Sequence, residues 1–303
     1  MSVSTLPIQD IKGQPLTGAQ REYLEGFFAG LSARGLKFSD VEPTPVTPKP
    51  AAPEELIFEE RVKRELHPLD AYPQLVENAG RNQPPDKEST FRFKWNGLFY
   101  LAPNKEAFMA RLRIPGGVVK TYQLREIAAL ARELTTGYVQ ITTRANFQLR
   151  LIQPKDAPEV LRRIQAVGLH TRGAGADNIR NLTANPTAGL DPKELINVLP
   201  LCQELGQIII NHREFYDLPR KFNIAYDGGG LIGTVEDTND IGARAVKISE
   251  EILFRIAVGG ATGHKSFARD LGVLVPPAEL NQVVIAMIRV YMANGNRTDR
   301  KKA

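Results

Sequence analysis

Hydrophobic positions follow two different periods in the middle of the chain. Residues 122–134 and 158–169 carry apolar side chains at the three- and four-residue spacing of a helix. Residues 107–114 and 137–152 instead alternate apolar with polar side chains, and the first of these segments stops at a Pro-Gly-Gly turn. This order of strand, helix, strand and helix predicts a ferredoxin-like, split βαβ half domain over residues 89–170.

The stretch TTRANFQLRL, at residues 142–151, has an unusual polar face. In an extended chain, one face would carry Thr143, Ala145, Phe147, Leu149 and Leu151, and the other Thr142, Arg144, Asn146, Gln148 and Arg150. No carboxylate occurs between Glu133 and Asp156. The segment is either one long strand or two strands with a kink near Arg144. Its polar face is either the wet side of an antiparallel sheet or an anion-binding surface, and the segment alone leaves both open.

Flanking segments predict two further domains. Residues 1–88 contain an amphipathic helix at 17–33, a proline-rich linker at 43–53 and a charged helix at 54–66. The last domain, at 171–303, starts with a loop rich in Gly, Asn and Pro. It continues with a helix at 193–210, a strand at 218–226, a further strand and a glycine-rich bend within 253–275, and a helix at 277–295. The expected fold class is α+β.

Composition and charge narrow the possible functions. The 303 residues are 42% apolar and 24% charged, as in soluble globular proteins. No apolar run approaches the roughly 20 residues that span a bilayer, and the N-terminus does not resemble a secretory signal, so no membrane association and a cytoplasmic location are expected. The net charge of +5 favours an anionic partner or substrate.

Cysteine and histidine usage predicts no metal site within these residues. Cys202 is the single cysteine of the sequence, and we expect a packed thiol because it lies beside Leu201 and Leu205 on a helix. The four histidines have no ligand spacing, which favours structural roles.

Basic side chains recur at strand ends and in tight loops, in RLRIPGG, TTRANFQLR, DNIRNLTANP and LPRKFN. On alternation, Arg111 and Arg113 share one strand face. We expect Arg113, Arg144, Arg180 and Lys221 to converge on one cavity, where guanidiniums can bind a multiply charged anion. Nucleic acid is not expected, because the basic residues do not cluster along one helix and aromatic residues are sparse among them.

These motifs carry a resemblance. ARLRIPGGVV, ITTRANFQLRL, NIRNLTANPTAGLDP, LPRKFNIAY and NGNRTDRKK together resemble the siroheme-dependent, ferredoxin-linked nitrite and sulfite reductases, and FRFKWNGLFY resembles the nitrite reductase branch. The resemblance runs from about Val62 to the end of the chain. It implies a ferredoxin-like half domain followed by the first siroheme-binding α+β domain of that family, here residues 171–303.

The resemblance also implies a cofactor and its ligands. Siroheme is an iron tetrapyrrole with eight carboxylates, which a surface of hydrogen-bond donors would suit. By similarity, the cofactor-binding residues are Thr142, Thr143, Arg144, Asn146, Gln148 and Asn223. The catalytic residues implied by similarity are Arg113, Arg180 and Lys221, around the face of the iron where the substrate anion binds.

The implied reaction is the six-electron reduction of nitrite to ammonia, a step of nitrate assimilation, with reduced ferredoxin as the electron donor. Asn223 favours nitrite, because the sulfite branch typically has a second lysine at this position. The alternatives are a sulfite reductase half that forms sulfide, and a fragment that binds a tetrapyrrole or anion without catalysis.

The chain departs from the family in its cysteines. The family holds a [4Fe–4S] cluster through four cysteines in its C-terminal half, whereas these residues contain only Cys202. The cluster is therefore expected only from the missing C-terminal half. We expect the chain to be inactive without a segment, or a complementary half chain, that carries those cysteines.

Overall fold

The computed structural model describes residues 10–11, 14–18, 21, 24–25, 56–101, 106–300 and 302. The chain divides into two compact units, Met1–Pro50 and Ala51–Ala303. In the first unit, β1 (Asp10–Ile11) pairs antiparallel with β2 (Gln14–Pro15). Most of the helix predicted at 17–33, and the whole proline-rich linker, lie outside the described residues.

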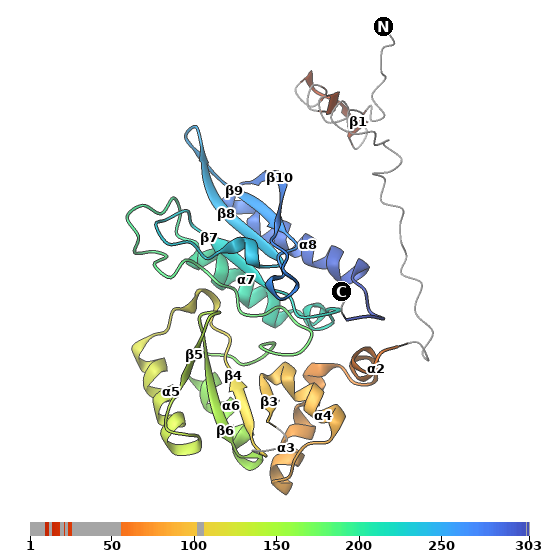
Figure 1. Cartoon of the computed structure of the whole chain (residues 1–303), viewed down its shortest axis with the longest axis vertical. Coiled ribbons are helices and arrows are strands. Elements are labelled where there is room, and N and C mark those ends of the chain that lie inside the picture. Colours follow the sequence, from red (N-terminus) through yellow and green to blue (C-terminus); the bar gives the residue numbers. More distant parts are fainter. Residues whose placement is uncertain are drawn as a thin grey trace. The chain divides into compact units, whose positions relative to one another are not determined.

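The second unit is a mixed α+β structure, as the sequence predicts (Figure 1). Its described helices are α2 (Phe58–Glu65), α3 (Tyr72–Arg81), α4 (Lys87–Arg92), α5 (Thr121–Leu134), α6 (Ala157–Ala166), α7 (Leu199–Asn211) and α8 (Leu280–Asn294). Its described strands are β3 (Leu98–Tyr100), β4 (Phe108–Arg111), β5 (Gln140–Thr142), β6 (Asn146–Ile152), β7 (Ile224–Asp227), β8 (Ile241–Ile248), β9 (Glu251–Val258) and β10 (Arg269–Val275). The sequence pattern did not predict α3, α4, β3 or β8, and it predicted one strand where β9 and β10 lie.

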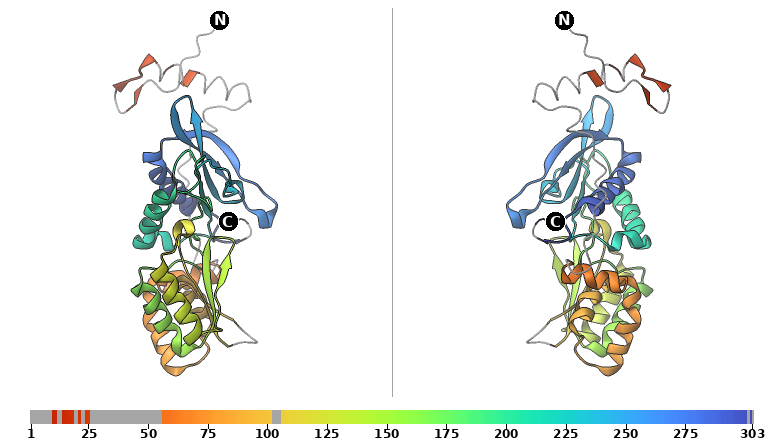
Figure 2. Two further views of the ribbon diagram at one scale, coloured as in Figure 1. Left: turned by 90° about the vertical axis from the view of Figure 1, so that its left-hand side faces the viewer. Right: turned by 90° about the vertical axis from the view of Figure 1, so that its right-hand side faces the viewer.

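The first sheet forms the ferredoxin-like half domain. Its strands run in the order β3-β4-β6-β5, all antiparallel, and α5 and α6 cover one face (Figure 2). The core between them is fully apolar and includes Leu98, Phe108, Ile127, Leu149 and Ile164. The apolar stripes of the two helices therefore meet the apolar face of the sheet, as their spacing predicts.

The alternating stretch at 137–152 folds as two strands joined by a tight turn, not as one long strand. Ala145, in the turn, has a positive φ of 48°, and its amide donates to the Thr142 carbonyl at 3.1 Å. Alternation fails again at Leu151, where φ is 61° and the pairing register with β4 shifts. This bulge buries Ile152 and leaves Leu151 half-buried, because an extra residue reverses the faces beyond it.

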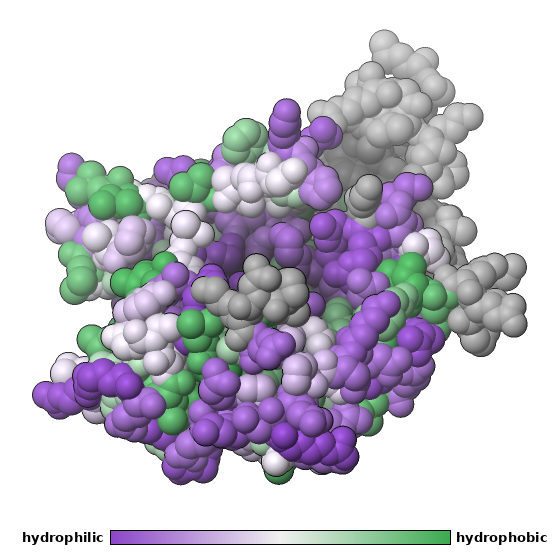
Figure 3. Space-filling view, turned by 60° about the horizontal axis from the view of Figure 1, so that its bottom comes forward, coloured by the Kyte–Doolittle hydropathy of each residue, from purple (hydrophilic) through white to green (hydrophobic). Residues whose placement is uncertain are grey.

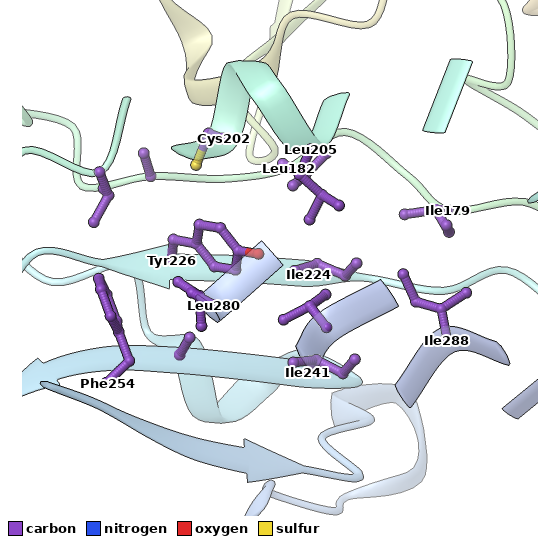
Figure 4. Close-up of a cluster of buried hydrophobic side chains, with 14 of the residues drawn as sticks. Ile179, Leu182, Cys202, Leu205, Ile224, Tyr226, Ile241, Phe254, Leu280 and Ile288 are labelled. Atoms are coloured by element: carbon purple, nitrogen blue, oxygen red, sulfur yellow. The ribbon is translucent and has the colours of Figure 1, made fainter. Parts of the chain in front are cut away.

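The second sheet has the order β10-β9-β8-β7, with β7 parallel to β8 and the other pairs antiparallel. Side chains from α7 and α8 pack against it in a second apolar core (Figure 4). Cys202 lies in this core near Leu205 and Tyr226, and burial raises the pKa of its thiol to about 12. Cys202 is therefore a packed thiol, as predicted.

The helix predicted from residue 193 begins only at Leu199. The backbone amides of Leu195 and Ile196 donate to the Gly228 carbonyl, at 2.8 and 3.3 Å. These bonds hold the segment before α7 against the glycine-rich turn after β7, so it cannot also close helical bonds.

A small third apolar cluster connects α2 and α4 with the segments between α6 and β7. Val62, Phe91, Trp95, Ala176 and Tyr216 pack together, and Trp95 Nε1 donates to the Tyr216 carbonyl at 3.2 Å. The loop that contains Ala176 is therefore fixed from the side of α2 and α4.

Candidate functional site

A polar cavity of about 940 Å³ opens between the two sheets of the second unit. Its walls come from the end of β4, the β5–β6 hairpin, the loop that ends near residue 186, the segment just before β7 and the loop at 233–239. Among the described residues that line it are four cations and no carboxylate; the cations are Arg111, Arg144, Arg180 and Lys221. The space-filling view shows a hollow with hydrophilic walls on one face of the molecule (Figure 3).

Arg144 links the hairpin to the second sheet. The turn places it at the hairpin tip, where its backbone amide donates to Thr142 Oγ1 at 3.3 Å. Its Nη2 donates to the carbonyls of Asn181 and Ile224, at 2.7 and 3.2 Å, and its Nη1 to Asn239 Oδ1 at 2.8 Å. Burial lowers the pKa of Arg144 to about 10, because the charged guanidinium has lost water.

Asn181 makes the reciprocal connection. Its Nδ2 donates to the carbonyls of Ile114 and Arg144, at 2.7 and 2.9 Å. Gly117, in the turn that follows Ile114, has φ of 75°, and a Cβ there would lie 2.6 Å from the Ala145 side chain. The Pro-Gly-Gly turn therefore needs glycine so that the hairpin tip can approach it closely.

Arg111 faces the cavity from the last position of β4. With the Gln148 amide oxygen turned toward it, Arg111 donates from Nε at 3.1 Å and from Nη2 at 3.3 Å. Its guanidinium lies 4.5 Å above the Phe99 ring. Burial, and then the nearby charge of Arg150, lower the pKa of Arg111.

Arg113 is not among the residues that line the cavity, which differs from the expectation. It is 3% exposed, and its guanidinium donates to the carbonyls of Ile179 (2.9 Å), Gly173 (3.4 Å) and Arg180 (3.4 Å). Strand β4 ends at Arg111, and the Arg113 amide pairs with the His170 carbonyl instead of β6. The alternation that would put Arg111 and Arg113 on one face therefore stops between them.

Arg180 and Lys221 complete the cationic lining. Arg180 Nη1 donates to the Ala174 carbonyl at 2.8 Å. Burial, and then repulsion from Arg111, lower the pKa of Arg180 to about 9, although Asp177 opposes the shift. Burial also lowers the pKa of Lys221, whose most strongly interacting charged neighbour, Asp240, raises it.

Cations that lie together and have lost part of their water in this way are poorly compensated until an anion binds. Asp240, the neighbouring carboxylate, lies outside the lining, and its Oδ2 accepts the Asn223 amide at 2.7 Å. The buried Nε of Arg144 has no hydrogen-bond partner, although buried donors are normally satisfied. The site is therefore suited to a ligand with several negative groups.

The structure brings together eight of the nine site residues predicted from the sequence. Thr142, Thr143, Arg144, Asn146, Gln148, Arg180, Lys221 and Asn223 line the cavity, whereas Arg113 is buried outside the lining. The sequence analysis did not count Arg111, Asn181 or Asn239 among the site residues. Arg111 could have been found had the strand been ended at the right residue, whereas the two asparagines act through contacts with distant segments that no local pattern reveals.

The donor set fits a tetrapyrrole with many carboxylates. Four cations and several amides and hydroxyls converge, and the volume is near the upper end of the roughly 300–1,000 Å³ typical of small-molecule sites. Within the part of the chain that the structure describes, no three His, Cys, Asp or Glu side chains group as metal ligands would. None of the described helices is long and apolar enough to cross a membrane.

Two family models match the chain in this region. Residues 100–167 match the nitrite/sulfite reductase ferredoxin-like half domain, and residues 175–303 match the nitrite and sulphite reductase 4Fe-4S domain. The chain belongs to the nitrite and sulfite reductase family. The fold expected from the resemblance is thereby confirmed.

Individual relatives agree with this assignment. The chain is 37% identical over 227 residues to the ferredoxin–nitrite reductase of Synechococcus elongatus, and 32% identical over 253 residues to that of Leptolyngbya laminosa. These matches cover 72% and 80% of the chain but only 44% and 50% of the relatives. The NirA structure of Mycobacterium tuberculosis matches with a TM-score of 0.75 and 27% identity, over 82% of this chain and 49% of that one.

Proposed function

We propose that the chain binds siroheme in the cationic cavity and acts as the N-terminal half of a ferredoxin-dependent nitrite reductase. The observation that carries the proposal is a cavity whose four charged lining residues are all cations. A surface with mixed charge would suit solvent or a neutral ligand equally well. The family membership and the names of the relatives support the choice of siroheme and nitrite.

The chain's own residues would divide into two groups. Arg144, Asn146 and Gln148, with Thr142 and Thr143, would hold the carboxylates of the macrocycle from the β5–β6 hairpin. Arg111, at the end of β4, lines the cavity and would take the role that was predicted for Arg113. Guanidiniums suit this task because their paired N–H groups match the two oxygens of a carboxylate.

Arg180 and Lys221 would attract the substrate anion and stabilise its oxygens. The lowered pKa of Lys221 makes its ammonium a better proton donor to an oxygen that leaves as water. Bound siroheme would supply the iron that binds the anion and passes electrons to it. Asn223, beside Lys221 in the cavity lining, would accept a substrate with less negative charge than sulfite.

The electron supply would come from elsewhere. Cys202 is buried in the second core, with a pKa near 12, so it is not a thiolate ligand. A [4Fe–4S] cluster would then need cysteines from a further segment or a complementary chain, and ferredoxin would be the donor. We retain residues 1–88, 89–170 and 171–303 as the proposed domains, with the siroheme-binding domain last.

The test is turnover with both anions. The chain is combined with a polypeptide that carries the cluster cysteines, and ammonia and sulfide are measured with reduced ferredoxin. We expect ammonia from nitrite, and the Asn223→Lys variant should shift the nitrite-to-sulfite ratio of kcat/KM toward sulfite by about tenfold, since a hydrogen bond to a charged group contributes roughly 1.5–3 kcal/mol. The exposed Lys120→Gln variant is the control. Equal ratios in Asn223→Lys and wild type would remove the nitrite assignment, and no turnover of either anion by a siroheme-loaded assembly would leave only a binding module.

A further inference from the structure

The contacts of the Arg180 side chain do not compensate its positive charge. Arg180 is half-buried, and the nearby charges of Arg111, Arg113 and Arg144 all lower its pKa. Its loop also contains Asp177, a fully buried carboxylate three residues away that attracts it. The neighbouring arginines repel Arg180, whereas Asp177 attracts it. Another group must therefore hold Arg180 toward the cavity before an anion binds.

The segment after α8 neutralises Asp177. Arg300 Nη1 and Nη2 donate to the two carboxylate oxygens of Asp177, at 2.7 and 2.6 Å. Arg300 lies only 3.5 Å from Glu59 of α2 as well. Burial raises the pKa of Asp177, and the hydrogen bond from Arg300 opposes that shift. The pair is a bidentate ion pair between segments more than 120 residues apart, in which Asp177 is fully buried and Arg300 is half-buried.

The same segment is fixed independently of Asp177. Arg297 Nη1 donates to Glu60 Oε2 at 2.9 Å and to Asp217 Oδ1 at 3.1 Å, and Arg220 Nη1 donates to the Arg300 carbonyl. Glu60 is 1% exposed. The segment that carries Arg300 is therefore held in place by contacts other than the pair between Arg300 and Asp177.

We propose that Arg300 is a positioning residue for Arg180: by occupying the Asp177 carboxylate, it keeps Arg180 available to anions in the cavity. This inference relies on the proposed function only for the identity of the anion. Without Arg300, Asp177 loses the cation that hydrogen-bonds to it. Lys63 also attracts Asp177, but its ammonium already donates to Glu60 and to the Leu218 carbonyl. Arg180 is a cation in the same loop as Asp177 that can take the place of Arg300. Arg180 would then leave the cavity.

The test uses the full chain in four variants: Arg300→Gln, Arg300→Lys, the double variant Arg300→Gln/Asp177→Asn, and Arg289→Gln. Arg289 forms an exposed bidentate pair with Glu214, so it is a matched control with the same chemistry away from the cavity. Siroheme affinity is measured by absorbance titration. Hydrogen exchange of the backbone amides of residues 172–181 is measured without siroheme. This segment includes the Arg180 amide, which donates to the Phe222 carbonyl at 2.7 Å.

We expect Arg300→Gln to weaken siroheme binding by roughly 10- to 100-fold, as loss of a residue that orients a ligand usually does. Exchange of 172–181 should become at least about tenfold faster. Arg300→Lys should give an affinity and an exchange rate between those of wild type and Arg300→Gln, because one ammonium cannot form the two parallel hydrogen bonds of a guanidinium. The double variant should recover most of the affinity, since no carboxylate remains to attract Arg180, and Arg289→Gln should behave as wild type.

The outcomes separate the two proposals. If wild type does not bind siroheme but exchange follows the expected order, the proposed cofactor is wrong and the positioning role stands. Wild-type exchange and affinity in Arg300→Gln would overturn the positioning role. A double variant as impaired as Arg300→Gln would also overturn it, because a purely structural role of Arg300 is not rescued by neutralising Asp177. If Arg300→Gln does not fold, Arg300→Lys against the double variant decides the same question.

Discussion

Replacing Arg144 with glutamine should reduce siroheme affinity by about 100-fold or more. The side chain lines the cavity, and hydrogen bonds to charged groups contribute roughly 1.5–3 kcal/mol each. Its three bonds to Asn181, Ile224 and Asn239 also join the hairpin to the second sheet, so the cavity wall itself would loosen. The measurement is an absorbance titration of the purified chain with siroheme.

The control for this prediction is Arg162→Gln. Arg162 is exposed on α6 and pairs with Glu159 at 2.7 Å. The Arg162→Gln variant therefore removes the same charge as Arg144→Gln without changing the cavity. Equal siroheme affinity in Arg144→Gln and Arg162→Gln would show that net charge, rather than the placement of Arg144, governs binding. Circular dichroism of both variants shows whether the fold is retained.

Arg111→Gln and Arg113→Gln should have opposite consequences although they are two residues apart. Arg113 is buried and satisfies three backbone carbonyls, so Arg113→Gln should lower the free energy of unfolding by about 3 kcal/mol, the scale of leaving buried polar groups unpaired. Arg111 is half-buried in the cavity wall, so Arg111→Gln should change stability by less than about 1 kcal/mol and weaken siroheme binding by about tenfold.

Urea unfolding and siroheme titration on the same two variants test this contrast. A stable Arg113→Gln variant with weak siroheme binding, beside an Arg111→Gln variant with normal binding, would restore the role that the sequence assigned to Arg113. If both variants lose stability equally, the distinction between Arg111 as a cavity-lining residue and Arg113 as a buried structural residue is wrong.

The fold was largely predictable because its apolar positions follow regular periods. The stripes of α5 and α6 and the alternation of β4 and β6 predicted the helices and strands that form the ferredoxin-like fold. The predictions failed at two places where the regular alternation breaks. The sequence gives no local sign of the bulge at Leu151 or of the strand end at Arg111, because both depend on which segment pairs with the backbone there.

The candidate site was predictable in its chemistry and less so in its geometry. Arg144, Arg180 and Lys221 come from a hairpin turn, a loop and the residue range before β7, and they do converge on one cavity. Charge pattern suggested that convergence, but only the folded chain shows how it is held. Asn181 connects the turn after β4 with the hairpin, and Arg300 reaches Asp177 from the far end of the sequence.

A crystal structure of the chain with siroheme tests the central claim most directly. We predict the macrocycle between the β5–β6 hairpin and β7, with its carboxylates within hydrogen-bond distance of Arg111, Arg144 and the neighbouring cations of the lining. Siroheme bound at another surface, with these guanidiniums still facing an open cavity, would contradict the account.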